Sequence, residues 1–129
     1  MIGILIVAHS AQLAAGVKEF VEQATHGNLR IAATGGDIDG NLGTSIDAIR
    51  AALRAVRSDA GVLVLVDFNS AVLSVEAVLE DEPGMRVIIS DAPLVEGAYF
   101  AAIEASIGAT LEETAAAALR ARDLIKVHN

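Results

Sequence analysis

Met1–Ser10 reads MIGILIVAHS, and it begins a pattern that recurs along the rest of the chain. Ile2–Ala8 is an unbroken apolar run rich in β-branched residues, which is typical of a strand buried on both faces of a parallel sheet. The run ends at His9 and Ser10, and an amphipathic helix follows at once, with Ser10 as a suitable N-cap. The stretch therefore predicts a strand–helix unit with a histidine at its junction.

The same alternation of strand and helix continues to the end of the chain. Further apolar runs predict strands over 29–34, 61–66 and 85–89, and helical spacing predicts helices over 11–24, 46–56, 71–82, 94–107 and 111–126. Such alternation implies a parallel sheet with right-handed crossovers. We expect one α/β domain over residues 1–129, a three-layer open sheet with strands in the order 2-1-3-4 and helices on both faces.

Helix starts and buried faces are also predicted. Thr44 with Asp47, and Thr110 with Glu113, match capping boxes at the start of two helices. The buried face of the first helix is predicted to be Leu13, Val17, Phe20, Val21 and Ala24, and that of the second Ile46, Ile49, Leu53 and Val56.

Composition excludes several classes of function. Of the 129 residues 53% are hydrophobic and 3% aromatic, so the core is built from Val, Ile, Leu and Ala. A formal net charge of −8 argues against binding a nucleic-acid backbone. The absence of cysteine excludes disulfides and thiolate chemistry. No apolar stretch reaches the roughly 18 residues of a membrane span, and the first strand lacks a basic leader, so we expect a cytoplasmic protein without membrane insertion.

A histidine and an aspartate stand at the carboxyl ends of the two strands predicted to be central. In the order 2-1-3-4, His9 and Asp67 flank the crevice where open α/β sheets bind ligands. A carboxylate on one imidazole nitrogen fixes the tautomer and makes the other nitrogen a better nucleophile. Because helix N-termini favour negative charge, we expect His9 to carry a phosphoryl group with Asp67 as its orienting partner. The alternative is a chance loop histidine beside a helix-capping aspartate.

Gly35–Ser45 (GGDIDGNLGTS) is rich in glycine and aspartate, which predicts tight turns and exposed backbone N–H groups. It lacks the lysine and the Ser/Thr of a nucleotide P-loop. Asp37, Asp39 and Asp47 do not have the spacing of a calcium loop. A receiver domain is excluded as well, because the first strand ends without its acidic metal-binding pair. A solvated turn and a contribution to the site both stay open.

Four motifs occur in order along the chain: Val7-Ala8-His9-Ser10, Gly36-Asp37 with Gly43-Thr44, Asp67–Ser74 (DFNSAVLS) and Ala92–Gly97 (APLVEG). On these motifs the chain resembles the phosphocarrier subunits (DhaM) of phosphoenolpyruvate-dependent dihydroxyacetone kinases, within the mannose-type IIA superfamily of the bacterial phosphotransferase system. The resemblance covers essentially the whole chain. Ser10 and the APLVEG run are more similar to the dihydroxyacetone branch than to the sugar-transport branch.

The resemblance implies a phosphotransferase subunit that works through a phosphohistidine. His9 would accept phosphate from an HPr-like phosphocarrier and pass it to ADP on the nucleotide-binding subunit of dihydroxyacetone kinase. It also implies a homodimer, and we expect no cofactor and no metal. With His9 and Asp67 as the catalytic residues, the candidate donors to phosphoryl oxygens are Ser10, Thr44, Asn69 and Ser70.

The chain departs from the family pattern at two points. Asn69 stands where the motif usually has glycine, which affects the geometry of its loop. The chain stops at Asn129 without the appended phosphocarrier domains of some relatives, so we expect its donor to be a separate protein. Two other functions stay open: a sugar-specific IIA component that donates to a IIB transporter subunit, and a non-catalytic regulatory module.

Overall fold

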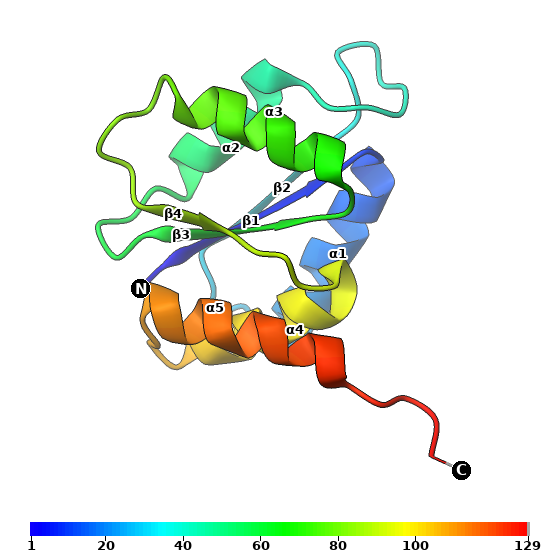
Figure 1. Cartoon of the computed structure of the whole chain (residues 1–129), viewed down its shortest axis with the longest axis vertical. Helices are drawn as coiled ribbons and strands as arrows, with labels where there is room; N and C mark the ends of the chain where they lie inside the picture. The colour runs from blue at the N-terminus through cyan, green and yellow to red at the C-terminus, as the bar shows by residue number, and fades with distance from the viewer. Residues whose placement is uncertain (129) are drawn as a thin grey trace.

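The computed structural model describes residues 1–128, and its centre is a parallel sheet with helices on both faces (Figure 1). The strands are β1 (Gly3–Ala8), β2 (Ile31–Gly35), β3 (Val62–Val66) and β4 (Val87–Ile89). They lie in the order β2-β1-β3-β4, and all three pairings are parallel. The α/β class and the strand order predicted from the sequence are confirmed.

Side chains alternate across the sheet and divide the interior into two cores. The helices are α1 (Ala11–Ala24), α2 (Ile46–Ala55), α3 (Asn69–Leu79), α4 (Leu94–Ser106) and α5 (Leu111–Arg120). Ile4 and Ile6 of β1 pack with α1, α4 and α5, whereas Leu5 and Val7 pack with α2 and α3. Because helices cover both faces, β1 and β3 are buried along their whole length and read as continuous apolar runs.

Two helices end earlier than the sequence predicts. α3 begins at Asn69 and ends at Leu79, instead of spanning 71–82. α5 ends at Arg120 and is followed by one 3₁₀ turn, Ala121–Asp123, instead of continuing to Lys126. The side chains of residues 122–128 are exposed, and a short helical segment without a packed face is not stable.

One predicted helix start is wrong and another is confirmed. Ser45, not Thr44, is the N-cap of α2, and its Oγ accepts a hydrogen bond from the Ala48 N–H. At α5 the capping box is present, because Thr110 accepts from the Glu113 N–H while the Glu113 carboxylate accepts from the Thr110 N–H.

The predicted buried faces are only partly correct. In α1 the buried residues are Ala14, Val17 and Val21, whereas Leu13, Phe20 and Ala24 are exposed. Helical spacing alone therefore assigned to the core three side chains that lie on the surface. The same holds for Ile46 at the start of α2, which is exposed.

The carboxyl edge of the sheet brings together the parts of the chain that follow β1 and β3. β1 and β3 are paired along their length, so the residues that follow them, His9 and Asp67, emerge side by side. α1 and α3 begin within three residues of these strand ends.

Within residues 1–128, no helix is both long and apolar enough to cross a membrane.

Candidate active site

The side chain of His9 is fixed by Asp67. Asp67 Oδ1 lies 2.9 Å from His9 Nδ1, and Oδ2 accepts a hydrogen bond of 2.9 Å from the His9 backbone N–H. Oδ1 also accepts from the Phe68 N–H at 2.8 Å. The carboxylate thus holds both the backbone and the ring of His9, and the ring cannot turn without losing a charge-assisted bond.

The same bonds determine the ionisation of Asp67. Partial burial raises the pKa of the Asp67 carboxyl group, but the bonds from the His9 N–H, the His9 ring and the Phe68 N–H outweigh this and lower the pKa below its usual value. Asp67 is therefore an anion near neutral pH. An anionic acceptor at Nδ1 requires a proton on that nitrogen, which assigns the lone pair of the neutral ring to Nε2.

Ser70 occupies the other side of the ring. Its Oγ lies 2.6 Å from His9 Nε2. With the lone pair on Nε2, the Ser70 hydroxyl is the donor, so Asp67, His9 and Ser70 form one hydrogen-bonded chain. The His9 side chain is 25% exposed, against 10% for Asp67. The contact at Nδ1 is partly buried and the contact at Nε2 is exposed, so Nε2 is the more accessible ring nitrogen.

Phe68 forms a wall beside the histidine. The two rings are 5.8 Å apart between centroids and tilted by 57°. Phe68 is the N-cap of α3 without a side-chain capping bond, and 70% of it is exposed. Sequence reasoning did not single out this residue as part of the site, although its place directly after Asp67 was a usable signal.

The glycine-rich loop is tied to His9 through the backbone. The N–H groups of Gly36 and Gly43 both donate to the His9 carbonyl oxygen, at 3.1 and 2.9 Å. Thr44 does not point its hydroxyl at the ring: its Oγ1 lies 2.8 Å from Ser74 Oγ. Ser74 in turn donates to the Ser70 carbonyl oxygen at 3.2 Å, so this loop and α3 are linked next to the site.

The other two predicted donors lie at helix starts. Ser10 Oγ accepts from the Leu13 N–H at 3.2 Å as the N-cap of α1, which leaves its hydroxyl hydrogen free to donate. Asn69 lines a cleft of about 650 Å³ beyond Phe68, at the ends of β3 and β4, where Arg122 is ion-paired with Asp91. Within residues 1–128 no group of three His, Asp or Glu side chains lies together as a metal site would require.

Comparison with known proteins places the chain in a family. A family model described as the PTS system fructose IIA component, EIIA-man, matches residues 3–115. The chain belongs to the mannose-type IIA family. Within it, the chain is 33% identical to the phosphoryl donor subunit DhaM of a PEP-dependent dihydroxyacetone kinase of Listeria innocua, over 87% of this chain and 92% of that protein. It is 34% identical to the phosphotransferase subunit DhaM of Lactococcus lactis, over 85% and 87% of the two chains.

Solved structures share the fold of this chain. A crystal structure described only as a protein of unknown function is 33% identical and superposes with a TM-score of 0.75, covering 92% of both chains. The phosphotransferase system component EIIA of Streptococcus agalactiae superposes with a TM-score of 0.73 over 98% of this chain. That protein is 16% identical, so its likeness to the mannose-type IIA chain described here is one of fold.

Proposed function

We propose that this chain is the phosphoryl donor subunit of a phosphoenolpyruvate-dependent dihydroxyacetone kinase. In this proposal His9 accepts a phosphoryl group from an HPr-like phosphocarrier and passes it to ADP held by the nucleotide-binding kinase subunit. The observation that carries the proposal is the hydrogen-bonded chain from Asp67 through His9 to Ser70, which leaves Nε2 as the nucleophile. The likeness to the DhaM subunits supports the choice of partners.

The first step moves the phosphoryl group onto His9. The Nε2 lone pair attacks phosphorus, and the bond from phosphorus to the donor's imidazole nitrogen breaks. The donor ring, protonated on its other nitrogen, leaves as neutral imidazole. His9 becomes a phosphorylated imidazolium, since Nδ1 keeps its proton, and the Asp67 carboxylate stabilises this positive charge at 2.9 Å.

Ser70 changes partner during this step. In the resting site its hydroxyl donates to the lone pair that must attack. Once the ring is phosphorylated that lone pair is gone, and the hydroxyl can donate to a phosphoryl oxygen instead. The starts of α1 and α3 supply further backbone N–H groups and the positive ends of two helix dipoles.

The remaining predicted donors have different roles in the proposal. Asn69, and the hydroxyl hydrogen of Ser10, are candidate donors to the phosphoryl oxygens. Thr44 acts less directly, because its hydroxyl is engaged with Ser74, which holds the Ser70 carbonyl.

In the second step an ADP phosphate oxygen attacks phosphorus, the Nε2–P bond breaks, and its electron pair returns to Nε2. Cytoplasmic location and the homodimer belong to the same proposal.

The acceptor is tested by discharge of the phosphorylated protein. A chain with a net charge of −8 and without a P-loop should not bind ADP tightly by itself. We expect the phosphorylated protein to stay phosphorylated with ADP alone and to be discharged when the ADP-loaded kinase subunit is added, more slowly at high salt. Rapid discharge to a IIB transporter subunit would instead indicate sugar transport. Discharge to neither would indicate a regulatory module.

A further inference from the structure

The chain from Asp67 through His9 to Ser70 joins a carboxylate, an imidazole and a hydroxyl. Asp67 Oδ1 lies 2.9 Å from Nδ1 of the ring, and Ser70 Oγ lies 2.6 Å from Nε2. Because Asp67 holds the proton on Nδ1, the Nε2 lone pair faces the Ser70 hydroxyl and can take its proton. These groups, in this order and at these distances, form a nucleophilic triad, which is recognised by geometry and not by sequence order.

The surroundings of Ser70 suit an attacking oxygen. Ser70 is exposed, so a reagent can reach its Oγ. Asn69 and Ser70 are the first two residues of α3, and their backbone N–H groups have no acceptor in a preceding turn of the helix. Such N–H groups, together with the positive end of the helix dipole, stabilise an oxyanion that forms beside Ser70.

An apolar cleft adjoins the triad. Its volume is about 650 Å³, and it is lined by Phe68 and by Asn69, the neighbour of Ser70. The apolar side chains of Val66, Val72 and Ile89 form further parts of its wall. Pockets of about 300 to 1,000 Å³ with mostly apolar walls are typical of sites for small molecules, so a small acyl group fits here.

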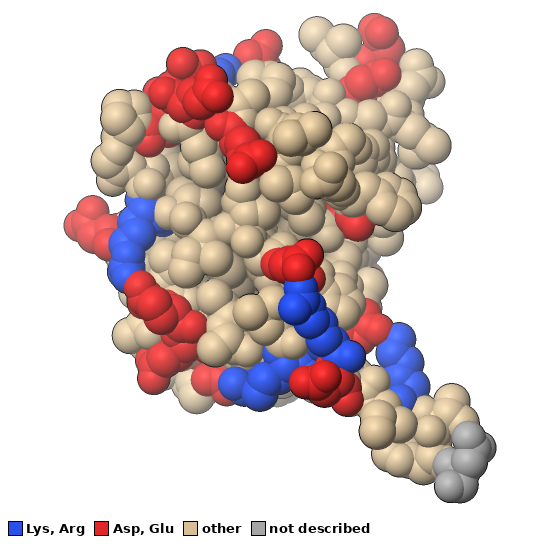
Figure 2. Space-filling model, viewed as in Figure 1, with Lys and Arg blue, Asp and Glu red and all other residues tan. Residues whose placement is uncertain are grey.

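The surface around the triad has no cations to hold an anionic substrate. Residues 1–17, 31–49 and 58–85, which include the triad and the glycine-rich loop, contain no Lys or Arg. In Figure 2 the corner occupied by that loop shows only acidic and uncharged atoms. A free carboxylate or phosphate compound is therefore repelled, whereas a neutral molecule is not.

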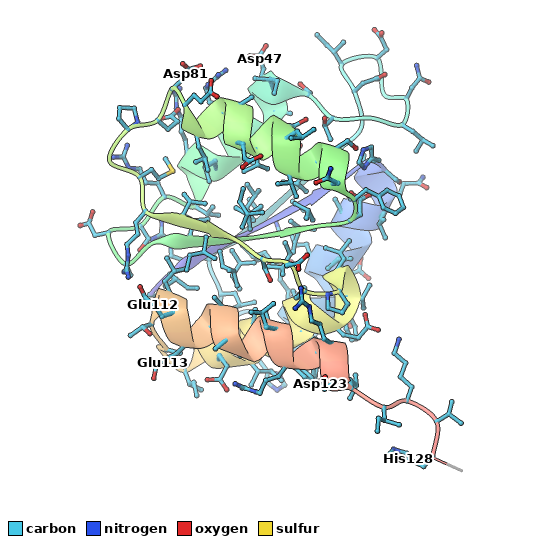
Figure 3. The ribbon with its side chains drawn as sticks, viewed as in Figure 1. Asp47, Asp81, Glu112, Glu113, Asp123 and His128 are labelled. Atoms are coloured by element: carbon cyan, nitrogen blue, oxygen red, sulfur yellow. The ribbon has the colours of Figure 1, made fainter. Side chains whose placement is uncertain are left out.

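Two arginines on the elements around this region are already engaged. Arg50 of α2 pairs with Asp47 and Asp81, whose side chains are labelled in Figure 3 on the outer layer of helices. Arg122 lines the cleft and is paired with Asp91. The charges of the cleft thus also favour a neutral substrate over an anionic one.

We propose that Ser70 is a second nucleophile of this site, activated by His9 and Asp67 to attack small neutral carboxylic esters. This activity goes beyond the proposed phosphoryl transfer. The two reactions exclude each other in time, because a phosphorylated Nε2 has no lone pair to accept the Ser70 proton.

The reaction has two steps. Ser70 Oγ attacks the carbonyl carbon of the ester while its proton moves to His9 Nε2, and the bond to the leaving alcohol breaks as that alcohol takes the proton. Water then attacks the acyl-serine and gives a proton to Nε2. The bond from the acyl carbon to Oγ breaks, Oγ regains the proton, and a carboxylic acid is released.

Labelling with a fluorophosphonate tests the nucleophile itself. Ser70 Oγ displaces fluoride from phosphorus, and mass spectrometry locates the label. We expect the label on Ser70, at a rate about 100-fold lower in His9→Ala, the scale of general base catalysis. Protein that is already phosphorylated on His9 should not be labelled.

Hydrolysis of p-nitrophenyl acetate tests the substrate class. An imidazole can attack this ester without a serine, so the informative variant is Ser70→Ala, which keeps His9. We expect this variant to lose at least about tenfold in rate, since the Oγ nucleophile is gone. The anionic ester p-nitrophenyl phosphate should stay intact with the unmodified protein.

The matched control is Ser58→Ala. Ser58 lies at the opposite, amino edge of the sheet, and its hydroxyl donates to the Met1 carbonyl oxygen at 2.7 Å instead of to an imidazole. Both rates should therefore be unchanged in this variant.

The inference is overturned if Ser70 takes no label, or if labelling is undiminished in His9→Ala or in the phosphorylated protein. Equal hydrolysis of the acetate ester by Ser70→Ala, or equal hydrolysis of the phosphate ester by the unmodified protein, would also overturn it. Labelling of the unphosphorylated protein needs no phosphoryl donor. Failure of His9 to accept phosphate would thus overturn the proposed function and not the reactivity of Ser70.

Discussion

At the scale of single residues, the His9 ring is held by two side chains with different consequences. Asp67 lies against Nδ1, whereas Ser70 lies against Nε2, the atom that attacks phosphorus in the proposed transfer. In that proposal the first contact orients the ring and balances its charge, and the second has to be released. The two contacts should be separable by mutation.

Replacing Asp67 tests the orienting contact. Asp67→Ala should lower the rate of phosphoryl transfer through His9 by about 10- to 100-fold, the usual scale for removing a group that orients a reactive side chain. Asp67→Asn keeps an acceptor for the Nδ1 proton but loses the negative charge, so a similar loss in this variant would assign the effect to charge. Rates from rapid-quench phosphorylation measure both. Asp59→Ala, on an exposed turn between α2 and β3, is the control. A rate within twofold of the unmodified protein in both Asp67 variants would contradict the role.

The lowered pKa of Asp67 also predicts how stability depends on pH. A carboxyl group with a lower pKa in the folded state stabilises the fold above its unfolded pKa of about 3.9, and this contribution is lost as pH falls through the folded pKa. The free energy of unfolding should therefore fall less steeply between about pH 5 and pH 3 in Asp67→Asn than in the unmodified protein. Urea denaturation at each pH measures this. Glu96, bonded to Lys126, and Glu113, bonded to Thr110, also have lowered pKa values but are common to both proteins. Parallel pH profiles would contradict the prediction.

The sequence could predict the pairing of His9 with Asp67 but not the whole network around them. The pairing follows from topology, because the carboxyl ends of adjacent parallel strands meet at one edge. The contact between Thr44 and Ser74 depends on the path of a loop in which Gly36, Gly40 and Gly43 have positive φ angles. Sequence patterns predict that such a loop turns, but not where its side chains arrive.

At the scale of elements, the end of β2 approaches the site closely enough to require glycine. A Cβ atom on Gly35 would lie 2.5 Å from the Ser10 carbonyl oxygen and 2.8 Å from that of Ala8. Both atoms belong to backbone that leads into and out of His9. The packing of β2 against β1 therefore sets the position of the histidine.

Gly35→Ala should disturb the fold and the site together. We expect it to lower the free energy of unfolding by about 1–3 kcal/mol, the usual cost of overpacking, and to slow phosphorylation of His9. Gly16→Ala is the matched control, since nothing lies within 4 Å of its added Cβ on the exposed side of α1. That change should stabilise the protein by up to about 1 kcal/mol. Equal stability of the two variants in urea denaturation would contradict the close approach.

Sequence reasoning was stronger for the central elements than for their ends. The order β2-β1-β3-β4 follows from buried apolar runs and right-handed crossovers, and the structure has it. The end of α5 was missed because Leu124 and Ile125 continue an apolar pattern although no core remains for them to face. Leu13 and Phe20 show the same limit, since spacing does not distinguish a core contact from exposed apolar surface.

At the scale of the whole molecule, that exposed apolar surface bears on the proposed homodimer. Leu13, Phe20 and Val95 are all exposed and line one hollow on the surface of α1 and α4. Sedimentation equilibrium should give a mass close to twice the 13.3 kDa of the chain at micromolar concentration. A mass of 13.3 kDa under these conditions would contradict the homodimer.

The most direct measurement of the central claim is the chemical identity of the phosphorylated residue. The protein is incubated with phosphoenolpyruvate, the general phosphotransfer enzyme and an HPr-like carrier, and the product is mapped by mass spectrometry. The phosphate should lie on His9, should be lost in acid and kept in base as a phosphoramidate is, and should be absent from His9→Ala. A phosphate on Ser10 or Ser70, or undiminished labelling of His9→Ala, would contradict phosphoryl transfer through His9.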